Sequence, residues 1–225
     1  IDQAKKRVQI IAGAGSNNTR ESINAAKHAQ QMGADAILCI TPYYNKPTQE
    51  GMFQHYKTIN DSISIPMVVY NVPGRTGVNL LPETVLRLCE LENVLAVKEA
   101  SGNVGQISEI HRLCGDKVTL LSGDDALTLP ILSVGGKGVI SVVANIVPEK
   151  MVALIDNYLK GNCEEALRLH EELYPLSQSM FIETSPAPVK AAMNVMGLNA
   201  GSVRLPLVDL SGRNKETLIR SEEHT

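Results

Sequence analysis

The sequence predicts an α/β protein built on a parallel β-sheet. Six short apolar runs alternate along the 225-residue chain with six segments of helical periodicity. The apolar runs are rich in Val, Ile and Leu and show little polar–apolar alternation, which is typical of strands buried on both faces of a sheet. Two architectures fit this pattern, an open doubly wound sheet and a (β/α)8 barrel. Both place their functional side chains at the carboxyl ends of the strands.

Gly and Pro residues mark the ends of the strands and helices in the first three strand–helix units. Gly13 follows the first apolar run, and Gly33 ends the first helical segment. Pro42 and Pro73 follow the next two apolar runs, and Pro82 occupies a favourable first-turn position of a helix. These signals predict strands at residues 8–12, 36–40 and 66–72, and helices at residues 19–32, 48–62 and 82–91.

Glycine signals and helical periodicity define the last three units. Gly115 ends one helical segment, and Gly161 ends another in which Met151, Leu154 and Tyr158 recur at helical spacing. These patterns predict strands at residues 94–100, 118–122 and 138–144, and helices at residues 104–113, 126–134 and 148–160. Residues 162–197 are predicted to be helical, with breaks near Pro175 and at residues 185–188.

The composition excludes several classes of function. A net charge of −3 and an aromatic content of 4%, with no Trp, give no support to nucleic-acid binding. No apolar run reaches the roughly 18 residues of a membrane span, so no membrane partner is expected. Four widely spaced cysteines and the lack of a His-Glu-x-x-His motif predict neither a disulfide framework nor a metal site. A reduced, cytoplasmic protein is the simplest interpretation.

Lys98 is the most informative single residue. It follows the apolar run at residues 94–97, and because side chains alternate along a strand, Val94, Ala96 and Lys98 share a face. If that face lies inside a barrel, burial disfavours the charged ammonium and lowers the pKa of the lysine. A neutral amine can attack a ketone and form a Schiff base. The alternative is a lysine that reaches solvent at the strand end and pairs with Glu99.

Tyr70 ends the preceding strand and strengthens the catalytic interpretation. Adjacent strands lie about 4.8 Å apart, so Tyr70 and Lys98 are predicted to lie within contact range. A phenol beside an imine-forming lysine can transfer protons while the imine forms and breaks down. The alternative is a tyrosine that packs in the core with a satisfied hydroxyl.

Two further strand-end loops carry candidate side chains. Arg75 lies on the Gly-rich turn at residues 73–77, and its planar guanidinium suits bidentate binding of a carboxylate. An ordinary surface arginine is the alternative. Tyr43 and Tyr44 follow the second predicted strand, where they are either functional phenols or packing residues.

Several segments together resemble the 4-hydroxy-tetrahydrodipicolinate synthase family, also called dihydrodipicolinate synthases. They occur in the order and spacing of that family, and the resemblance covers nearly the whole chain. The segments are Thr41-Pro42-Tyr43-Tyr44-Asn45-Lys46-Pro47, Tyr70-Asn71-Val72-Pro73-Gly74-Arg75-Thr76-Gly77, Lys98-Glu99-Ala100-Ser101-Gly102-Asn103, Leu121-Ser122-Gly123-Asp124-Asp125 and Gly136-Lys137-Gly138-Val139-Ile140-Ser141-Val142-Val143-Ala144-Asn145.

The resemblance implies a class I, Schiff-base (β/α)8 lyase that condenses pyruvate with L-aspartate 4-semialdehyde in lysine and diaminopimelate biosynthesis, without a cofactor or a metal. By motif, Lys98 would form the imine of pyruvate, and Tyr70 would be its proton donor and acceptor. Tyr44 would join the proton relay of a neighbouring subunit in a homo-oligomer, a dimer or a homotetramer. The substrate-binding positions that match the family are Arg75 for the semialdehyde carboxylate, and Gly123 and Ile140 in the pyruvate pocket.

The resemblance also implies a site for an inhibitor. Asn17, Glu21 and Tyr43 match positions at which lysine binds between subunits in many members of the family. Inhibition by lysine is therefore a hypothesis for this chain. Asn18 and Glu21 have the spacing of a helix capping box, which explains Glu21 without any ligand.

Three other functions compete with the synthase interpretation. A pyruvate-dependent aldolase of the N-acetylneuraminate lyase type would share Lys98 and Tyr70 but lack an arginine at position 75. A non-catalytic, ligand-sensing member of the fold would not need all three side chains. Residues 13–18 follow a strand and open a helix as in a dinucleotide-binding protein, but the third Gly of that fingerprint is missing.

The resemblance aligns the first strand of this chain with the third strand of the family. Two βα units, with the threonine of the proton relay, are therefore expected to be missing before Ile1, and residues 1–225 alone are expected to be inactive and poorly soluble. The expected domains are a partial barrel at residues 1–161 and a helical extension at residues 162–219. Residues 220–225 are interpreted as a non-native tail, because a common sequencing-adapter read translates to the same six residues.

Overall fold

The computed structural model describes residues 1–222, and the chain separates into two compact units. Unit 1 contains Ile1–Gly123 and Ser133–Lys137, and unit 2 contains Asp124–Leu132 and the chain from Gly138 onward. The expected division at residues 161 and 219 stays a prediction. Residues 223–225 of the expected tail lie outside the described residues.

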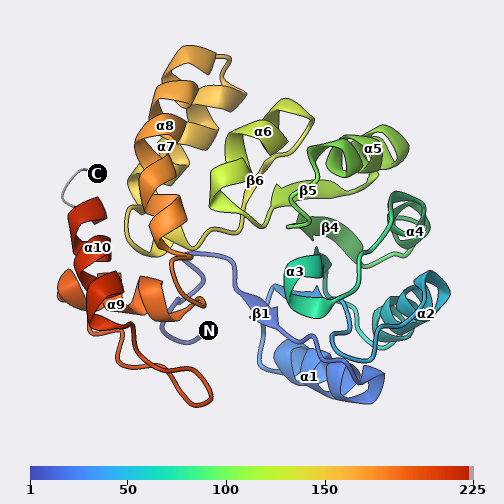
Figure 1. Ribbon diagram of the computed structural model, residues 1–225. Helices are drawn as coiled ribbons and strands as arrows, with labels where there is room; N and C mark the ends of the chain where they lie inside the picture. Colours follow the sequence, from blue (N-terminus) through green and yellow to red (C-terminus); the bar gives the residue numbers. More distant parts are fainter. Residues whose placement is uncertain (223–225) are drawn as a thin grey trace. The chain divides into compact units, whose positions relative to one another are not determined.

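Unit 1 consists of five strands that alternate with helices, as the sequence predicts. Each strand pairs in parallel with the one before it. The strands are β1 (Ile11–Gly13), β2 (Ala36–Ile40), β3 (Met67–Asn71), β4 (Val94–Glu99) and β5 (Thr119–Ser122). The helices are α1 (Thr19–Gln31), α2 (Gln49–Asn60), α3 (Pro73–Thr76), α4 (Pro82–Leu88), α5 (Val104–Cys114) and the 3-10 turn η1 (Gly115–Lys117). Figure 1 shows α1, α2, α4 and α5 along one face of these strands.

The order of the strands decides between the two predicted architectures. The six strands, including β6 (Gly138–Val139), follow one another in the sheet as β1-β2-β3-β4-β5-β6. A doubly wound sheet reverses its strand order at a switch point, whereas a (β/α)8 barrel keeps the order of the sequence. The topology is therefore that of a partial (β/α)8 barrel, which the resemblance had implied.

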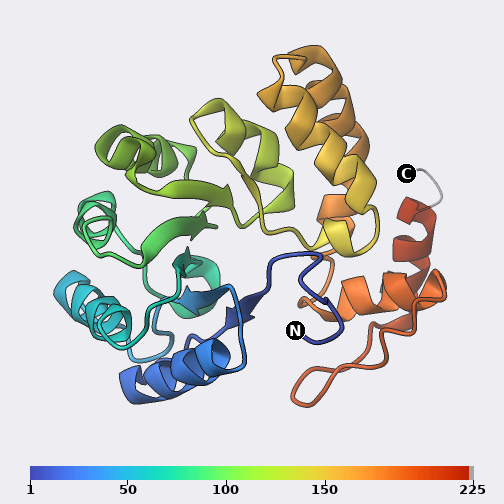
Figure 2. The same cartoon turned by 180° about the vertical axis from the view of Figure 1, so that it is seen from behind.

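Unit 2 is largely helical around a core of its own. In both Figure 1 and Figure 2, α7 and α8 lie side by side. Its elements besides β6 are η2 (Asp125–Leu127), α6 (Thr128–Ser133), η3 (Val143–Asn145), α7 (Pro148–Leu159), α8 (Cys163–Ser179), α9 (Ala187–Val195) and α10 (Gly212–Glu222). The core includes Leu132, Met151, Leu154, Leu173, Leu176, Ala192 and Leu218.

The strand that the sequence predicts at residues 138–144 is too long. In the structure β6 ends at Val139, and Val143 begins the 3-10 turn η3. The backbone N–H groups of Val142 and Val143 donate to the buried carboxylate of Asp125, with N···O distances of 2.9 and 3.3 Å. Since these donors are engaged by a side chain, they are not available to extend a strand ladder.

The helix break predicted near Pro175 is wrong. The break predicted at residues 185–188 exists but lies earlier, between the end of α8 at Ser179 and the start of α9 at Ala187. Helix α8 continues through Pro175 to Ser179. A proline inside a helix costs roughly 3 kcal/mol because it removes one backbone donor and crowds the preceding turn. Leu169, Leu173 and Leu176 are buried on one face of α8, and their packing offsets that cost.

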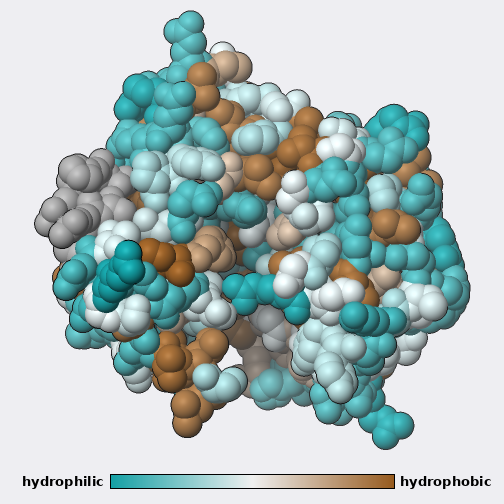
Figure 3. Space-filling view, in the orientation of Figure 1, coloured by the Kyte–Doolittle hydropathy of each residue, from teal (hydrophilic) through white to brown (hydrophobic). Residues whose placement is uncertain are grey.

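Apolar side chains are exposed on the loop between α9 and α10. Leu205 is 84% exposed and Val208 is 65% exposed. Figure 3 shows hydrophobic surface in the region of this loop. Among the helices that the structure describes, none is both long enough and apolar enough to cross a membrane.

His55 is a buried histidine where α2 packs on α1. Its side chain is 5% exposed, and its Nδ1 lies 2.9 Å from the hydroxyl of Thr19. Its Nε2 is buried without a hydrogen-bond partner among the described residues. Burial lowers the pKa of His55 to about 4. The unfolded chain, in which a histidine titrates near 6.5, therefore binds this proton more tightly than the folded chain does.

We expect His55 to make the protein less stable in acid. Its contribution is fully present above about pH 6.5 and declines as the pH falls, reaching a loss of about 3 kcal/mol in the free energy of unfolding at pH 4. Denaturant titrations at pH 7 and pH 4 measure this difference. The variant His55→Gln should show a correspondingly smaller difference, and the exposed-site control His28→Gln should keep it. Equal pH dependence in the two variants would refute this assignment.

Candidate active site

Lys98 and Tyr70 lie side by side at the carboxyl ends of neighbouring strands. Tyr70 in β3 and Lys98 in β4 are direct partners in the parallel register. The Nζ of Lys98 lies 4.1 Å from the centroid of the Tyr70 ring, so their predicted contact is confirmed. Lys98 is only 9% exposed, which makes the alternative of a solvent-reaching lysine wrong. The two strands thus hold an amine against a phenol in a largely dry environment.

Gly123 leaves the space that the Lys98 side chain occupies. The N–H of Gly123 donates to the carbonyl of Glu99 at 2.8 Å, which places the residue after β5 beside the end of β4. A Cβ at this position would lie 2.8 Å from the Cβ of Ala100 and 3.0 Å from the Cε of Lys98. Such distances are too short for carbon atoms in contact. The missing side chain of Gly123 is therefore a requirement of the Lys98 conformation.

Arg75 lies on α3, the one-turn helix that follows Tyr70. The turn predicted here is thus helical, with the Arg75 N–H donating to the Val72 carbonyl at 2.9 Å. Gly77 ends the turn at a φ of 75°, a conformation that glycine adopts without strain. The Arg75 side chain is exposed, and among the side chains described, residues 1–218, it belongs to none of the ion pairs. Its guanidinium is accessible to a carboxylate from solution.

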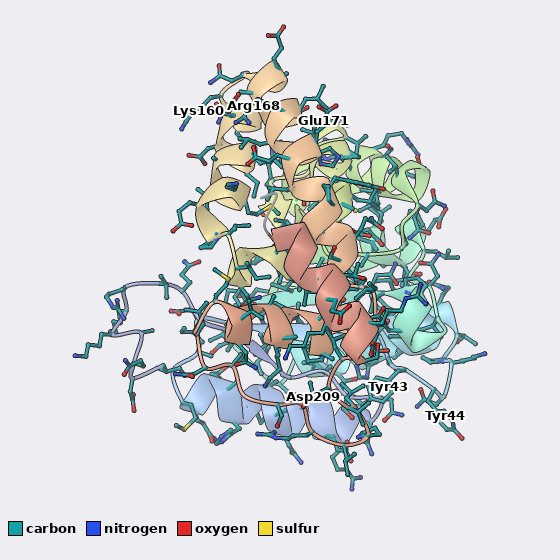
Figure 4. The ribbon with its side chains drawn as sticks, turned by 60° about the vertical axis from the view of Figure 1, so that its left-hand side comes forward. Tyr43, Tyr44, Lys160, Arg168, Glu171 and Asp209 are labelled. Atoms are coloured by element: carbon teal, nitrogen blue, oxygen red, sulfur yellow. The ribbon has the colours of Figure 1, made fainter. Side chains whose placement is uncertain are left out.

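Tyr44 is exposed and held in an unfavourable backbone conformation. Its φ is 73°, and this region costs roughly 1–2 kcal/mol for a residue with a side chain. The Tyr44 N–H donates to the Thr76 carbonyl at 3.3 Å. The Tyr44 side chain is 88% exposed, that of Tyr43 39%, and Figure 4 shows Tyr44 directed away from the ribbon. An exposed aromatic side chain held at this cost suits contact with another molecule.

The structure brings Asn17 to the loop that carries Tyr43. The side-chain amide of Asn17 donates to the Tyr43 carbonyl at 3.1 Å, and the amide of Asn45 donates back to the Asn17 carbonyl at 2.9 Å. These two bonds tie the segment after β1 to the segment after β2. Two of the three positions matched to the inhibitor site are therefore direct neighbours.

Glu21 is only partly explained by helix capping. The Asn18 side chain accepts hydrogen bonds from the N–H groups of Arg20 and Glu21, as the capping interpretation predicts. In a capping box the side chain of the third helical residue, here Glu21, would accept a hydrogen bond from the Asn18 N–H. That N–H instead donates to the Ser16 hydroxyl at 3.2 Å. The Glu21 carboxylate instead accepts from that same hydroxyl at 2.8 Å.

Ile140 lies in unit 2, directly after β6. The next residue, Ser141, donates its hydroxyl to Asp125, and the same hydroxyl accepts the Ala144 N–H at 2.8 Å. Burial raises the pKa of Asp125, and its hydrogen bonds to residues 141–143 oppose the shift. Asp125, the last residue of the Leu121–Asp125 segment, thus fixes the backbone that follows Ile140.

Asn71 and Glu99 are buried polar residues that the sequence-based prediction of the site missed. Both are fully buried, and they face each other across β3 and β4. The Asn71 amide donates to the two Glu99 carboxylate oxygens at 3.3 and 3.1 Å. The available signal was a polar residue directly after each of the two candidate catalytic residues, at positions that a two-sided core would fill with apolar side chains.

The described residues contain no cluster suited to a metal ion. Within residues 1–218, no group of three or more His, Cys, Asp or Glu side chains is arranged to hold one. Cys39, Cys89, Cys114 and Cys163 are free thiols. Burial raises the pKa of Cys39 to about 12, so this thiol stays protonated at neutral pH and is a poor nucleophile.

Comparison with known proteins identifies the family to which this chain is similar. The sequence model of the dihydrodipicolinate synthetase family matches residues 1–224. A 4-hydroxy-tetrahydrodipicolinate synthase from Citrifermentans bemidjiense is 55% identical over 224 residues, which are 99% of this chain and 77% of the relative. A crystal structure of a dihydrodipicolinate synthase superimposes with a TM-score of 0.96 at 52% identity, over 99% of this chain and 77% of the other.

Two solved relatives carry small molecules. The chloride-inhibited dihydrodipicolinate synthase from Acinetobacter baumannii, complexed with pyruvate, matches with a TM-score of 0.97 at 41% identity, over 100% of this chain and 77% of its own. A relative from Cyanidioschyzon merolae with lysine bound matches with a TM-score of 0.96 at 41% identity, over 98% and 75%. The family match over residues 1–224 and the agreement in sequence and fold show that the chain belongs to the dihydrodipicolinate synthetase family of enzymes.

Proposed function

We propose that the protein is a Schiff-base lyase that condenses pyruvate with L-aspartate 4-semialdehyde to 4-hydroxy-tetrahydrodipicolinate, in lysine and diaminopimelate biosynthesis. The observation that carries this proposal is the buried Lys98 amine, 4.1 Å from the centre of the Tyr70 ring. The names of the relatives and the pyruvate complex of one of them support it.

The chemistry begins at the Nζ of Lys98. The amine adds to C2 of pyruvate, and loss of water gives an imine. Loss of a proton from C3 gives an enamine, whose C3 attacks the aldehyde carbon of the second substrate while the aldehyde oxygen takes up a proton. The amino group of the new chain then attacks C2, which closes the ring and releases Lys98. Tyr70 lies beside the amine, where its hydroxyl can give and accept the protons of these steps.

In this proposal the other candidate residues bind the substrates or take part in the proton relay. Arg75 binds the semialdehyde carboxylate, and Gly123 and Ile140 border the pyruvate. Tyr44 extends from its exposed loop into the relay of a second subunit, so that the functional protein is a homo-oligomer. A binding site for lysine at Asn17, Glu21 and Tyr43 draws support from the lysine-bound relative. The cytoplasmic location stays a prediction.

A substrate comparison tests the proposed function. The protein, expressed from its complete gene, is assayed with pyruvate plus aspartate 4-semialdehyde and, separately, with N-acetylneuraminate. We expect turnover of the first pair and no cleavage of the second compound. Cleavage of N-acetylneuraminate alone would identify the other aldolase, and pyruvate binding without turnover would identify a ligand sensor. An assay of residues 1–225 alone tests their expected inactivity.

A further inference from the structure

Behind the proposed catalytic pair lies a second pair of residues that the proposed chemistry does not use. Asn71 follows Tyr70 in β3, and Glu99 follows Lys98 in β4, and the two are also register partners. Successive side chains of a strand point to opposite faces. Asn71 and Glu99 therefore meet on the face of the sheet opposite to Tyr70 and Lys98.

The Glu99 carboxylate is surrounded by hydrogen-bond donors. It accepts the Asn71 amide at 3.1 and 3.3 Å, the Ser101 backbone N–H at 2.6 Å and the Gln106 amide at 3.4 Å. Burial raises the pKa of Glu99, and the bonds from Asn71, Ser101 and Gln106 oppose that shift. A protonated carboxyl would place a donor against one of these donors, so the arrangement fits the carboxylate.

Backbone groups fix the direction of these hydrogen bonds. The Leu80 N–H can only donate, and it donates to the Asn71 side-chain oxygen at 2.9 Å. The Asn71 amide nitrogen must then point to Glu99 and to Asn79, whose side-chain oxygen accepts at 2.8 Å. Asn79 and Gln106 exchange two further hydrogen bonds, at 2.7 and 3.1 Å. The Asn71–Glu99 network, defined as Asn71, Asn79, Glu99, Ser101 and Gln106, thus has one consistent set of donors and acceptors.

The same two residues also connect the strand ends through their backbone. The Asn71 carbonyl accepts the Ala100 N–H at 2.9 Å, and the Glu99 carbonyl accepts the Gly123 N–H at 2.8 Å. Gly123 in turn borders the Lys98 side chain. We propose that the Asn71–Glu99 network is a positioning device that fixes the relative placement of Tyr70 and Lys98 from the opposite face of the sheet. This inference rests on the proposed function and assigns Asn71 and Glu99 as positioning residues for it.

The test is a swap of the amide and the carboxylate. Glu99→Gln places an amide donor against the donors of Asn71 or Gln106, and Asn71→Asp places two carboxylates against each other. The double variant Asn71→Asp, Glu99→Gln restores the pairing of donors with acceptors. The aspartate accepts from the Leu80 N–H and from the glutamine amide, provided that the Asn79 and Gln106 amide groups rotate by about half a turn. Glu109→Gln on α5, which removes only the exposed ion pair with Arg112, is the matched control.

The readout is the rate at which pyruvate forms a borohydride-trappable imine at Lys98, per folded molecule, in protein expressed from its complete gene. Misplaced reacting groups lose rate steeply, so we expect each single variant to be slower by about tenfold or more. The double variant should recover to within about threefold of the parent, and Glu109→Gln should match the parent. A purely structural role would lower the unfolding midpoint without changing the rate of the folded protein.

The outcomes separate this inference from the function on which it rests. A parent that forms an imine, together with single variants of unchanged rate, overturns the positioning role alone, as does a double variant that stays as slow as the single ones. A parent that forms no imine overturns the proposed function and the inference with it. If the single variants do not fold, Gln106→Ala decides, because it removes one donor to Glu99 and the bonds to Asn79 but leaves the Asn71–Glu99 bonds in place. We expect a loss of about threefold, and an unchanged rate contradicts the proposal.

Discussion

Replacing Lys98 with alanine is expected to abolish the pyruvate-dependent activity. The variant removes the amine that the structure places against the Tyr70 ring. Without a covalent imine, pyruvate must lose its C3 proton as a free ketone, which is a much harder step. We expect kcat to fall by at least about 10⁴-fold. The measurement is the steady-state rate with pyruvate and aspartate 4-semialdehyde, in protein expressed from its complete gene.

A second substitution at the same position separates charge from nucleophilicity. Lys98→Arg keeps a cation near the Tyr70 ring, but a guanidinium stays protonated and does not attack a ketone. We expect it to be as inactive as the alanine variant, whereas Lys57→Ala, which removes an exposed lysine of α2, should retain the parent rate. Substantial activity in Lys98→Arg would show that the residue acts only as a cation, and the lyase mechanism would be wrong.

Replacing Gly123 with alanine is expected to cause the second-largest loss. The added methyl group would lie 2.8 Å from the Cβ of Ala100 and 3.0 Å from the Cε of Lys98. Ala100 is fixed by its backbone bond to Asn71, so the flexible lysine must move. A displacement of about 1 Å at a reacting group costs on the order of 100-fold in rate, and we expect kcat to fall by about that factor.

Gly212→Ala on α10 is the matched control, because Gly212 is exposed and has open space where a Cβ would be. It should keep the parent rate within about twofold. Far-UV circular dichroism checks that both variants are folded. If Gly123→Ala keeps full activity while folded, the Lys98 side chain does not depend on this space, and the described geometry of the site is incorrect.

The pairing of Tyr70 with Lys98 could be predicted because it depends on local signals. Each residue ends an apolar run, and consecutive strands of a βα repeat are neighbours in a barrel. The Asn71–Glu99 network could not be predicted in the same way, because it needs Gln106 of α5 and Asn79 of a loop, both set by tertiary packing. The early end of β6 had the same cause: a carboxylate at Asp125 takes the N–H groups that the local pattern assigned to a strand.

The backbone of Tyr44 and the continuity of α8 show two further limits of local patterns. A tyrosine has no intrinsic preference for a positive φ, and the conformation of Tyr44 follows from the bonds of its loop to Thr76 and Asn17. Pro175 is a strong local signal for a break, but burial of one face of α8 outweighs it. In both positions long-range packing decides the structure.

Imine formation between Lys98 and pyruvate has one direct test. The protein expressed from its complete gene is incubated with pyruvate, reduced with borohydride, digested and analysed by mass spectrometry. We predict a single modified peptide, containing Lys98, heavier by the mass of one pyruvate less one oxygen atom. No adduct, or an adduct confined to other lysines, would show that Lys98 does not form the imine.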